Sequence, residues 1–179
     1  MSPRIHSAAP RGALSVFLLA LAACTTQPPA PPPPAPLTTS TPQQQVAAIR
    51  AAGGDGEGEL AVQPLRDPKV EDLRAKAERL EAQQHYDDAA STLDQALEIV
   101  PDDPALLQER AEAALLQGDH ARAEALARRA FETGSQVGPL CRRHWATIEQ
   151  SRLLESDAAG AADAKAKIDA CTVAGVNRY

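Results

Sequence analysis

Apolar residues recur at helical spacing through the second half of the chain. From residue 70 onward, aliphatic side chains return every three or four positions, which is the period of one face of an α-helix. A polar break at residues 101–104, with the sequence Pro-Asp-Asp-Pro, separates the first two apolar stripes from the next two. The pattern therefore predicts consecutive antiparallel helices joined by short turns.

The stripes repeat with a period of about 34 residues. The equivalent pairs are Ala77 and Ala111, Gln84 and Gly118, Ala89 and Ala123, and Ala96 and Ala130. The first segment also carries Leu73, Leu80, Tyr86, Leu93 and Pro101 at characteristic positions. In these residues the sequence resembles the tetratricopeptide repeat family, which implies helix–turn–helix units whose small residues let two helices cross closely. A generic antiparallel helical bundle is the alternative.

A divergent third unit is expected after Gly138 and Pro139. One predicted helix runs from residue 140 to 154 and carries Trp145 and Ile148, and a second runs from 158 to 171. We therefore expect an all-α, TPR-like array of about three helical pairs. The predicted units are 70–103, 104–137 and 138–174, followed by a tail at 175–179.

The N-terminus has the pattern of an export signal. Residues 1–23 contain Arg4 and Arg11, no acidic residue, and an apolar run of signal-peptide length at 13–22. The run ends in Leu-Ala-Ala-Cys, which resembles the lipobox of bacterial lipoproteins. The resemblance implies removal of residues 1–23 and acylation of Cys24, and Thr25 favours the outer membrane facing the periplasm. An ordinary secretory signal with an incidental cysteine is the alternative.

Residues 24–69 are predicted to form a flexible tether. Ten of the fifteen prolines lie between Pro28 and Pro68, and a Gly-rich polar stretch follows residue 52. This stretch lacks the ending of a phosphate-binding loop. A short helix is expected at 43–52, but the composition predicts that no part of this segment buries a core.

The two remaining cysteines are predicted to pair. Cys141 and Cys171 each lie fifteen residues from the turn centre near Ser156, so an antiparallel hairpin brings them together at its open end. Exported proteins meet oxidising conditions, which favours a disulfide. A metal site built on Cys141 and His144, one helical turn apart, is the weaker alternative.

The family resemblance also implies a concave groove lined by the first helix of each unit. Carrying over the facing positions gives Glu71, Arg74, Glu78, Glu81, Gln108, Glu112, Arg142 and Arg143, together with Ala105, Leu115 and Thr147. Glu78 also lies four residues from Arg74, a helical ion-pair spacing. The carboxylates favour a basic or mixed peptide as the ligand.

The remaining chemistry points to binding rather than catalysis. The net charge of −6 gives no reason to expect nucleic acid, and the acidic and histidine residues form no catalytic constellation. We expect no enzyme activity, no cofactor and no small-molecule substrate. The leading hypothesis is a lipid-anchored adaptor that binds a protein partner during envelope assembly or secretion. A structural spacer and, more remotely, a metal carrier or enzyme are the alternatives.

Overall fold

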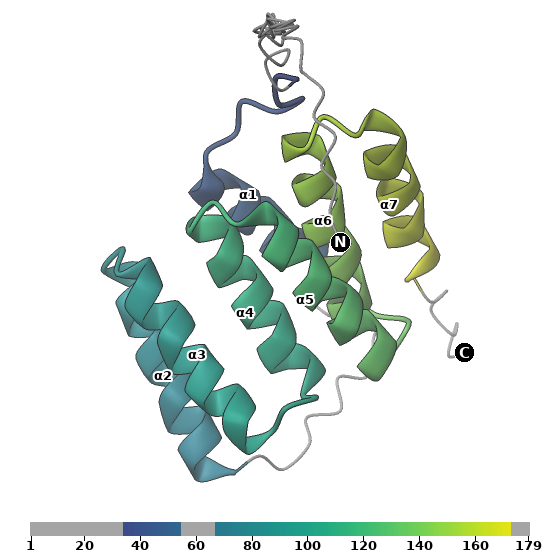
Figure 1. Cartoon of the computed structure of the whole chain (residues 1–179). Helices are drawn as coiled ribbons and strands as arrows, with labels where there is room; N and C mark the ends of the chain where they lie inside the picture. The colour runs from purple at the N-terminus through teal and green to yellow at the C-terminus, as the bar shows by residue number, and fades with distance from the viewer. Residues whose placement is uncertain (1–33, 55–66, 173–179) are drawn as a thin grey trace, which may run out of the picture. The chain divides into compact units, whose positions relative to one another are not determined.

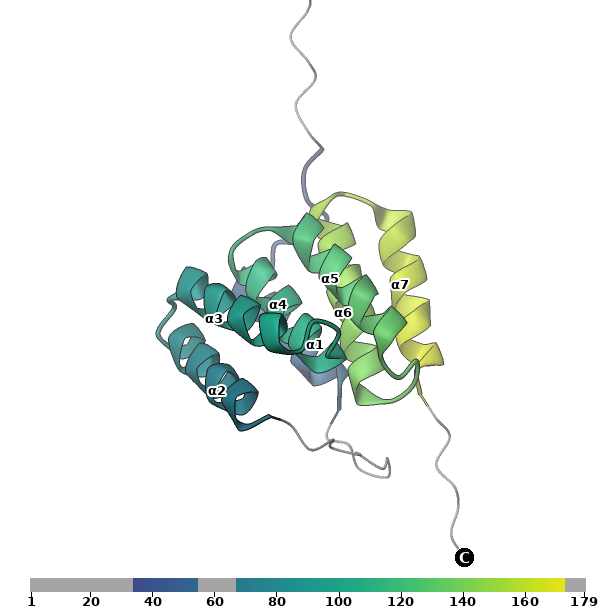
Figure 2. The same cartoon turned by 60° about the horizontal axis from the view of Figure 1, so that its bottom comes forward.

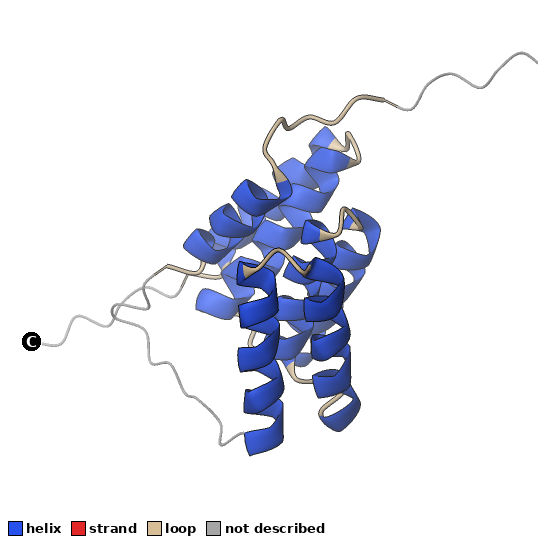
Figure 3. Cartoon of the chain, turned by 90° about the vertical axis from the view of Figure 1, so that its left-hand side faces the viewer, coloured by secondary structure: helices blue, strands red, loops and turns tan. Residues whose placement is uncertain are grey.

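Residues 34–54 and 67–172 are described by the computed structural model. Over these ranges the chain forms seven α-helices and no β-strand (Figure 3). The expected all-α class is therefore confirmed. The expected signal peptide, Cys24 and the tail at 175–179 lie outside the described residues.

Six of the helices form three consecutive antiparallel hairpins (Figure 1). They are α2 (Pro68–Ala82) with α3 (Tyr86–Ile99), α4 (Pro104–Leu116) with α5 (His120–Thr133), and α6 (Pro139–Leu154) with α7 (Ala158–Ala170). Neighbouring hairpins contact each other through α3 with α4 and through α5 with α6. The three hairpins correspond to the three expected units, which confirms the TPR-like arrangement.

Proline begins the first helix of every hairpin. Pro68, Pro104 and Pro139 occupy the first turn, where the N–H that proline lacks would have no helical acceptor. Asp67 and Asp103 precede two of these helices, and their carboxylates accept backbone N–H groups of the first turn. The sequence therefore fixes the start of each unit locally.

The turn inside each hairpin uses a left-handed backbone. Gln84, Gly118 and Ser156 stand at equivalent places, two residues after the end of the first helix, with φ angles of 62°, 79° and 63°. Glycine adopts this conformation without a steric penalty, whereas glutamine and serine carry a Cβ that opposes it. The predicted equivalence of Gln84 and Gly118 is therefore confirmed in the backbone.

Small side chains hold the helices close together. In the first hairpin, the buried Ala77, Ala90 and Ala96 pack around Leu93, and Leu106 of α4 joins the same cluster. In the last two hairpins, Trp145 packs edge-on against Phe131 with 5.0 Å between ring centroids. Small residues at helix crossings allow this close approach, as the sequence predicted.

The expectation of a tether without a core is wrong for residues 42–52. The predicted short helix is present as α1 (Pro42–Ala52), begun by a reciprocal capping box between Thr41 and Gln44. Its Val46 and Ile49 are 2% and 0% exposed and join the core of the repeats. Two aliphatic residues three positions apart suffice to dock this helix onto an existing apolar surface.

Candidate protein-binding groove

α1 lies across the first helices of the second and third hairpins. It packs against α4 and α6, and Figure 2 shows it beside these two helices. Val46 and Ile49 share one apolar cluster with Leu115 of α4 and Ala146 of α6. Part of the expected groove is therefore filled by the chain's own N-terminal segment.

Arg142 of α6 holds the C-terminal end of α1. Its Nε donates to the carbonyl oxygen of Ala52 at 3.1 Å, and its Nη2 donates to that of Gly53 at 2.7 Å. Carbonyl groups at the end of a helix receive no hydrogen bond from the helix itself. A cation at this end also complements the negative end of the helix dipole. Arg142 therefore acts as a side-chain cap for α1.

Glu112 of α4 is the charged residue beneath α1. Its side chain is fully buried and accepts from Arg50 Nε of α1 at 2.8 Å and from Arg143 Nη2 of α6 at 2.5 Å. Burial lowers the pKa of the Arg50 guanidinium, but its hydrogen bond to Glu81 and the charge of Glu112 outweigh this and raise it above its ordinary value. The carboxylate of Glu112 therefore joins three helices.

A buried polar chain continues from Glu112 toward the disulfide. Gln108 Nε2 donates to Glu112 Oε1 at 2.9 Å and to Thr147 Oγ1 at 2.8 Å, so its Oε1 is the acceptor facing His144 Nδ1 at 2.7 Å. This assigns the proton to His144 Nδ1. Burial, with the nearby charge of Arg143, lowers the pKa of His144 to about 3, so the imidazole is neutral.

An open cleft of about 530 Å³ lies between α2 and the helices α1, α4 and α6. Its charged lining consists of Glu71, Arg74, Glu78 and Glu81 of α2, Arg50 of α1, Glu109 of α4 and Arg143 of α6. Ala75, Ala77, Ala89 and Leu93 supply its apolar lining. The cleft therefore combines a small apolar patch with a charged border, as peptide-binding grooves commonly do.

Apart from Glu78, the charged side chains that line this cleft are held in ion pairs. Arg74 binds Glu109 on α4, with Nε 2.9 Å from Oε2, and Glu71 on its own helix at 3.0 Å. The hydrogen bonds to Glu109 chiefly raise the pKa of Arg74 above its ordinary value. The ion pair between Arg74 and Glu78, expected from their four-residue spacing, does not form, because the Arg74 side chain points toward Glu109 and Glu71. Over the described ranges, Glu78 contacts no cation.

The expected groove residues fall into two groups. Glu71, Arg74, Glu78, Glu81 and Arg143 line the open cleft. Gln108 and Glu112 are fully buried, and Arg142 is bound to α1, so these three do not face a free groove. The reason is that α1 covers α4 and α6 and turns their facing positions into an internal interface.

Two charged lining residues, Arg50 and Glu109, were not among the expected set. Glu109 follows the expected Gln108 directly, so a slightly wider helical face would have included it. Arg50 lies in the segment interpreted as tether, where the spacing of Val46 and Ile49 was the available signal. A face of helix α1 therefore contributes to a site that had been ascribed to the repeats alone.

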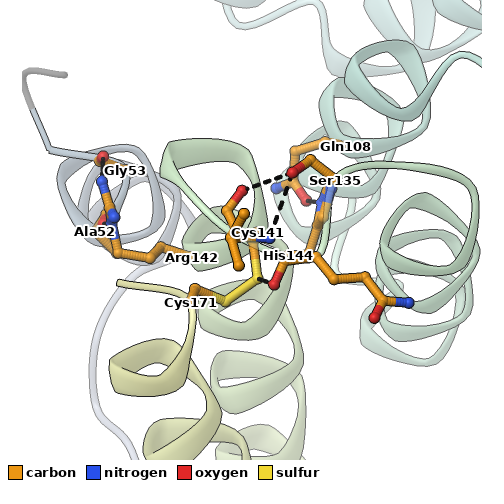
Figure 4. The surroundings of a disulfide bond; sticks show 10 residues. Ala52, Gly53, Gln108, Ser135, Cys141, Arg142, His144 and Cys171 are labelled. Carbon is orange, nitrogen blue, oxygen red and sulfur yellow. Dashed lines mark hydrogen bonds between the residues drawn. A yellow bond between two sulfur atoms is a disulfide. The ribbon is translucent and has the colours of Figure 1, made fainter. Parts of the chain in front are cut away.

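The predicted disulfide between Cys141 and Cys171 is present in the structure (Figure 4). It joins the start of α6 to the residue after α7, with 5.7 Å between the Cα atoms, and both residues are buried. The sulfur of Cys141 is thus bonded to carbon and sulfur only, which rules out the alternative of a metal site shared with His144.

Two further properties of the described residues bear on the site. In residues 34–54 and 67–172, no three histidine, cysteine or carboxylate side chains converge in the manner of a metal centre. No helix in those same ranges combines the length and the apolar character needed to cross a bilayer.

Comparisons with known proteins agree with the helical repeats. A family model for the tetratricopeptide repeat matches residues 80–137, which contain α3, α4 and α5. The globular C-terminal domain of P. aeruginosa LpoP is similar in structure, with 33% sequence identity and a TM-score of 0.55. This similarity covers 59% of the present chain and 99% of the LpoP domain. Curated proteins yield no match.

Proposed function

The chain belongs to the tetratricopeptide repeat family, and from this premise we propose that it is a non-catalytic adaptor that binds a protein partner at the bacterial cell envelope. Lipid on Cys24 anchors it to the outer membrane, and the repeats face the periplasm. The anchor rests on the sequence of residues 1–25, which lie outside the described part of the chain.

The observation that carries the binding role is the open cleft along α2. Its arginines are already fixed by carboxylates of α2 and α4, so a partner meets a surface whose charged side chains need little reordering. Glu78 stands in this lining without a cation from the described residues, and it offers a carboxylate to a lysine or arginine of the partner. A peptide segment of mixed or basic character fits this lining.

Photo-crosslinking in intact cells tests the adaptor role. The reactive group replaces Ala75, which lines the cleft. With Glu78→Lys added, we expect the crosslinked partner to fall at least tenfold, since a like charge replaces an attractive one. Glu98→Lys, an exposed residue of α3 outside the cleft lining, is the matched control. If both variants keep the crosslink, or no partner is found at all, the groove proposal is wrong.

Glu112 is unsuited to this test although it belongs to the expected groove. Its buried carboxylate holds Arg50 and Arg143, so reversing its charge would disrupt the packing of three helices instead of partner binding alone.

Fractionation of cells tests the anchor. Cys24→Ser should release the protein from membranes, because no thiol is left to carry the lipid. By resemblance to sorted lipoproteins, Thr25→Asp should move it to the inner membrane. A Cys24→Ser chain that still sediments with membranes would contradict the lipid anchor while leaving the adaptor role open.

A further inference from the structure

The surface beneath α1 combines apolar with charged side chains. The surface under α1 adds Glu112, Arg142 and Arg143 to its apolar residues, and each of the three contacts α1 or a residue bound to it. A mixture of aliphatic anchors with charged and hydrogen-bonding groups is typical of a binding interface.

Two of the three apolar clusters of the fold do not include α1. The cluster around Leu93 and the cluster around Trp145 both lack α1 residues. The segment between Gly54 and Asp67 contains Gly56 and Gly58, and at full extension it reaches about 40 Å. Release of α1 would therefore leave these two clusters intact and would uncover Leu115 and Ala146 of the third cluster, where a partner helix could bind.

The fit of α1 is also imperfect. The side chain of Gln45 is 1% exposed, and its Oε1 has no hydrogen-bond partner among the described residues. A buried acceptor without a donor opposes docking. Arg50 keeps 47% of its side chain exposed while it binds Glu112, so its ion pair is only partly shielded from water. These features favour an occupant that can be exchanged.

We propose that α1 is exchanged for a helix of the partner with the same pattern, so that the bound partner extends from the cleft along α2 onto α4 and α6. This inference rests on the proposed adaptor function and gives the partner a defined chemistry. The pattern is two aliphatic residues three positions apart, an arginine directly after the second, and a small residue just past the helix end.

Each part of the pattern follows from a contact of α1. Val46 and Ile49 enter the apolar cluster with Leu115, and the adjacent Arg50 reaches Glu112. A small residue fits best after the helix, because a Cβ on Gly53 would lie 3.2 Å from the side chain of Arg143, which would have to shift. Arg142 supplies donors to the last carbonyl groups of any helix seated there.

The test uses residues 25–179 and a fluorescent peptide of residues 40–54, with binding followed by anisotropy. The tethered α1 competes with the free peptide at an effective concentration on the order of 1 mM. If the peptide has a dissociation constant of about 0.1 mM for the empty site, this competition weakens its apparent affinity roughly tenfold. We therefore expect the double variant with Val46→Asp and Ile49→Asp to bind the peptide about tenfold more tightly than the wild-type chain. Adding Glu112→Gln should weaken this binding again, and a peptide carrying Ile49→Asp should not bind.

A second measurement covers the case in which the double variant does not fold. A protease site is inserted after Gly56, and the cut chain is passed through gel filtration at micromolar concentration. Loss of the α1 fragment with unchanged helicity in the remainder supports the inference. Retention of the fragment, or loss of helicity on its release, makes α1 a permanent part of the fold and overturns it.

Two other outcomes also count against the inference. A double variant that folds but ignores the peptide shows that the groove does not take a free helix, while the Glu78→Lys crosslinking experiment still judges the adaptor role separately. A wild-type dimer that the double variant abolishes would mean that α1 docks on a second copy of the chain.

Discussion

The disulfide should dominate the stability of the last hairpin. Ala161 and Ala164 are the only apolar residues of α7 itself that are buried, so this helix has few large side chains with which to hold its place. Cys141 and Cys171 are 30 residues apart. In the chain-entropy model, closing such a loop lowers the entropy of the unfolded state by about 12 cal/mol/K, or about 3.6 kcal/mol at 25 °C.

This free energy corresponds to a large thermal shift. With about 2.1 cal/mol/K of unfolding entropy per residue over roughly 130 residues, opening the disulfide should lower Tm by about 13 °C. The expected change applies both to the reduced wild-type chain and to the variant Cys141→Ala with Cys171→Ala. The reduced chain keeps both sulfurs, so it separates loss of the bond from loss of side-chain volume.

Urea unfolding measures the effect directly. Trp145 lies one helical turn from Cys141 and in the same apolar cluster, so its fluorescence reports on this part of the fold. Hydrogen exchange should become faster in α7 before it does in α4. Reductant should leave the double variant unchanged, which is the control. A difference below about 1 kcal/mol between the oxidised and reduced chains would refute the reasoning.

Three further predictions concern single side chains. In urea unfolding followed by circular dichroism, Gln84→Gly should raise the free energy of unfolding by about 0.5–1 kcal/mol, because it removes a Cβ at a φ of 62°, whereas Gly118→Ala should lower it. Glu112→Gln should cost about 2–3 kcal/mol in the same assay, more than Glu109→Gln, because it leaves two guanidinium groups facing a neutral side chain. The pKa of His144 is about 3 when folded and near 6.5 when unfolded. The unfolded chain therefore binds the extra proton between these values, and stability should fall by about 1.4 kcal/mol per pH unit below 6.5. Comparing urea midpoints at pH 7.5 and pH 5 should show this loss of about 2 kcal/mol, and His144→Asn should remove most of it.

The hairpins could be predicted because their signals are local and repeated. Alanines at a period of 34, prolines at helix starts and a residue such as Gly118 at the turn all report on nearby backbone. The pairing of Cys141 with Cys171 followed from symmetric spacing about one turn. Each of these features depends only on the geometry of one helical pair, and the residues that determine that geometry lie close together in the sequence.

The environment of Glu112 could not be predicted in the same way. Its position on the first helix of a unit correctly indicated the groove side, but its burial depends on α1, a segment about sixty residues earlier in the chain. α1 itself has eleven residues and only two aliphatic anchors within a proline-rich region. An isolated helix of that length is only marginally stable in water. Its formation therefore depends on packing against α4 and α6, which the local sequence of α1 does not reveal.

The single tryptophan of the chain has a consequence for how folding is followed. Trp145 belongs to the cluster of the last two hairpins, whereas α2 and α3 pack in another cluster that reaches the rest of the array through Leu106 and Ala113 of α4. In a linear array, coupling passes mainly between nearest neighbours, and end units can melt separately. Tryptophan fluorescence therefore does not report fraying of the first hairpin. An unfolding midpoint measured from it describes only the C-terminal half of the array, and unfolding of the whole array need not be all-or-none.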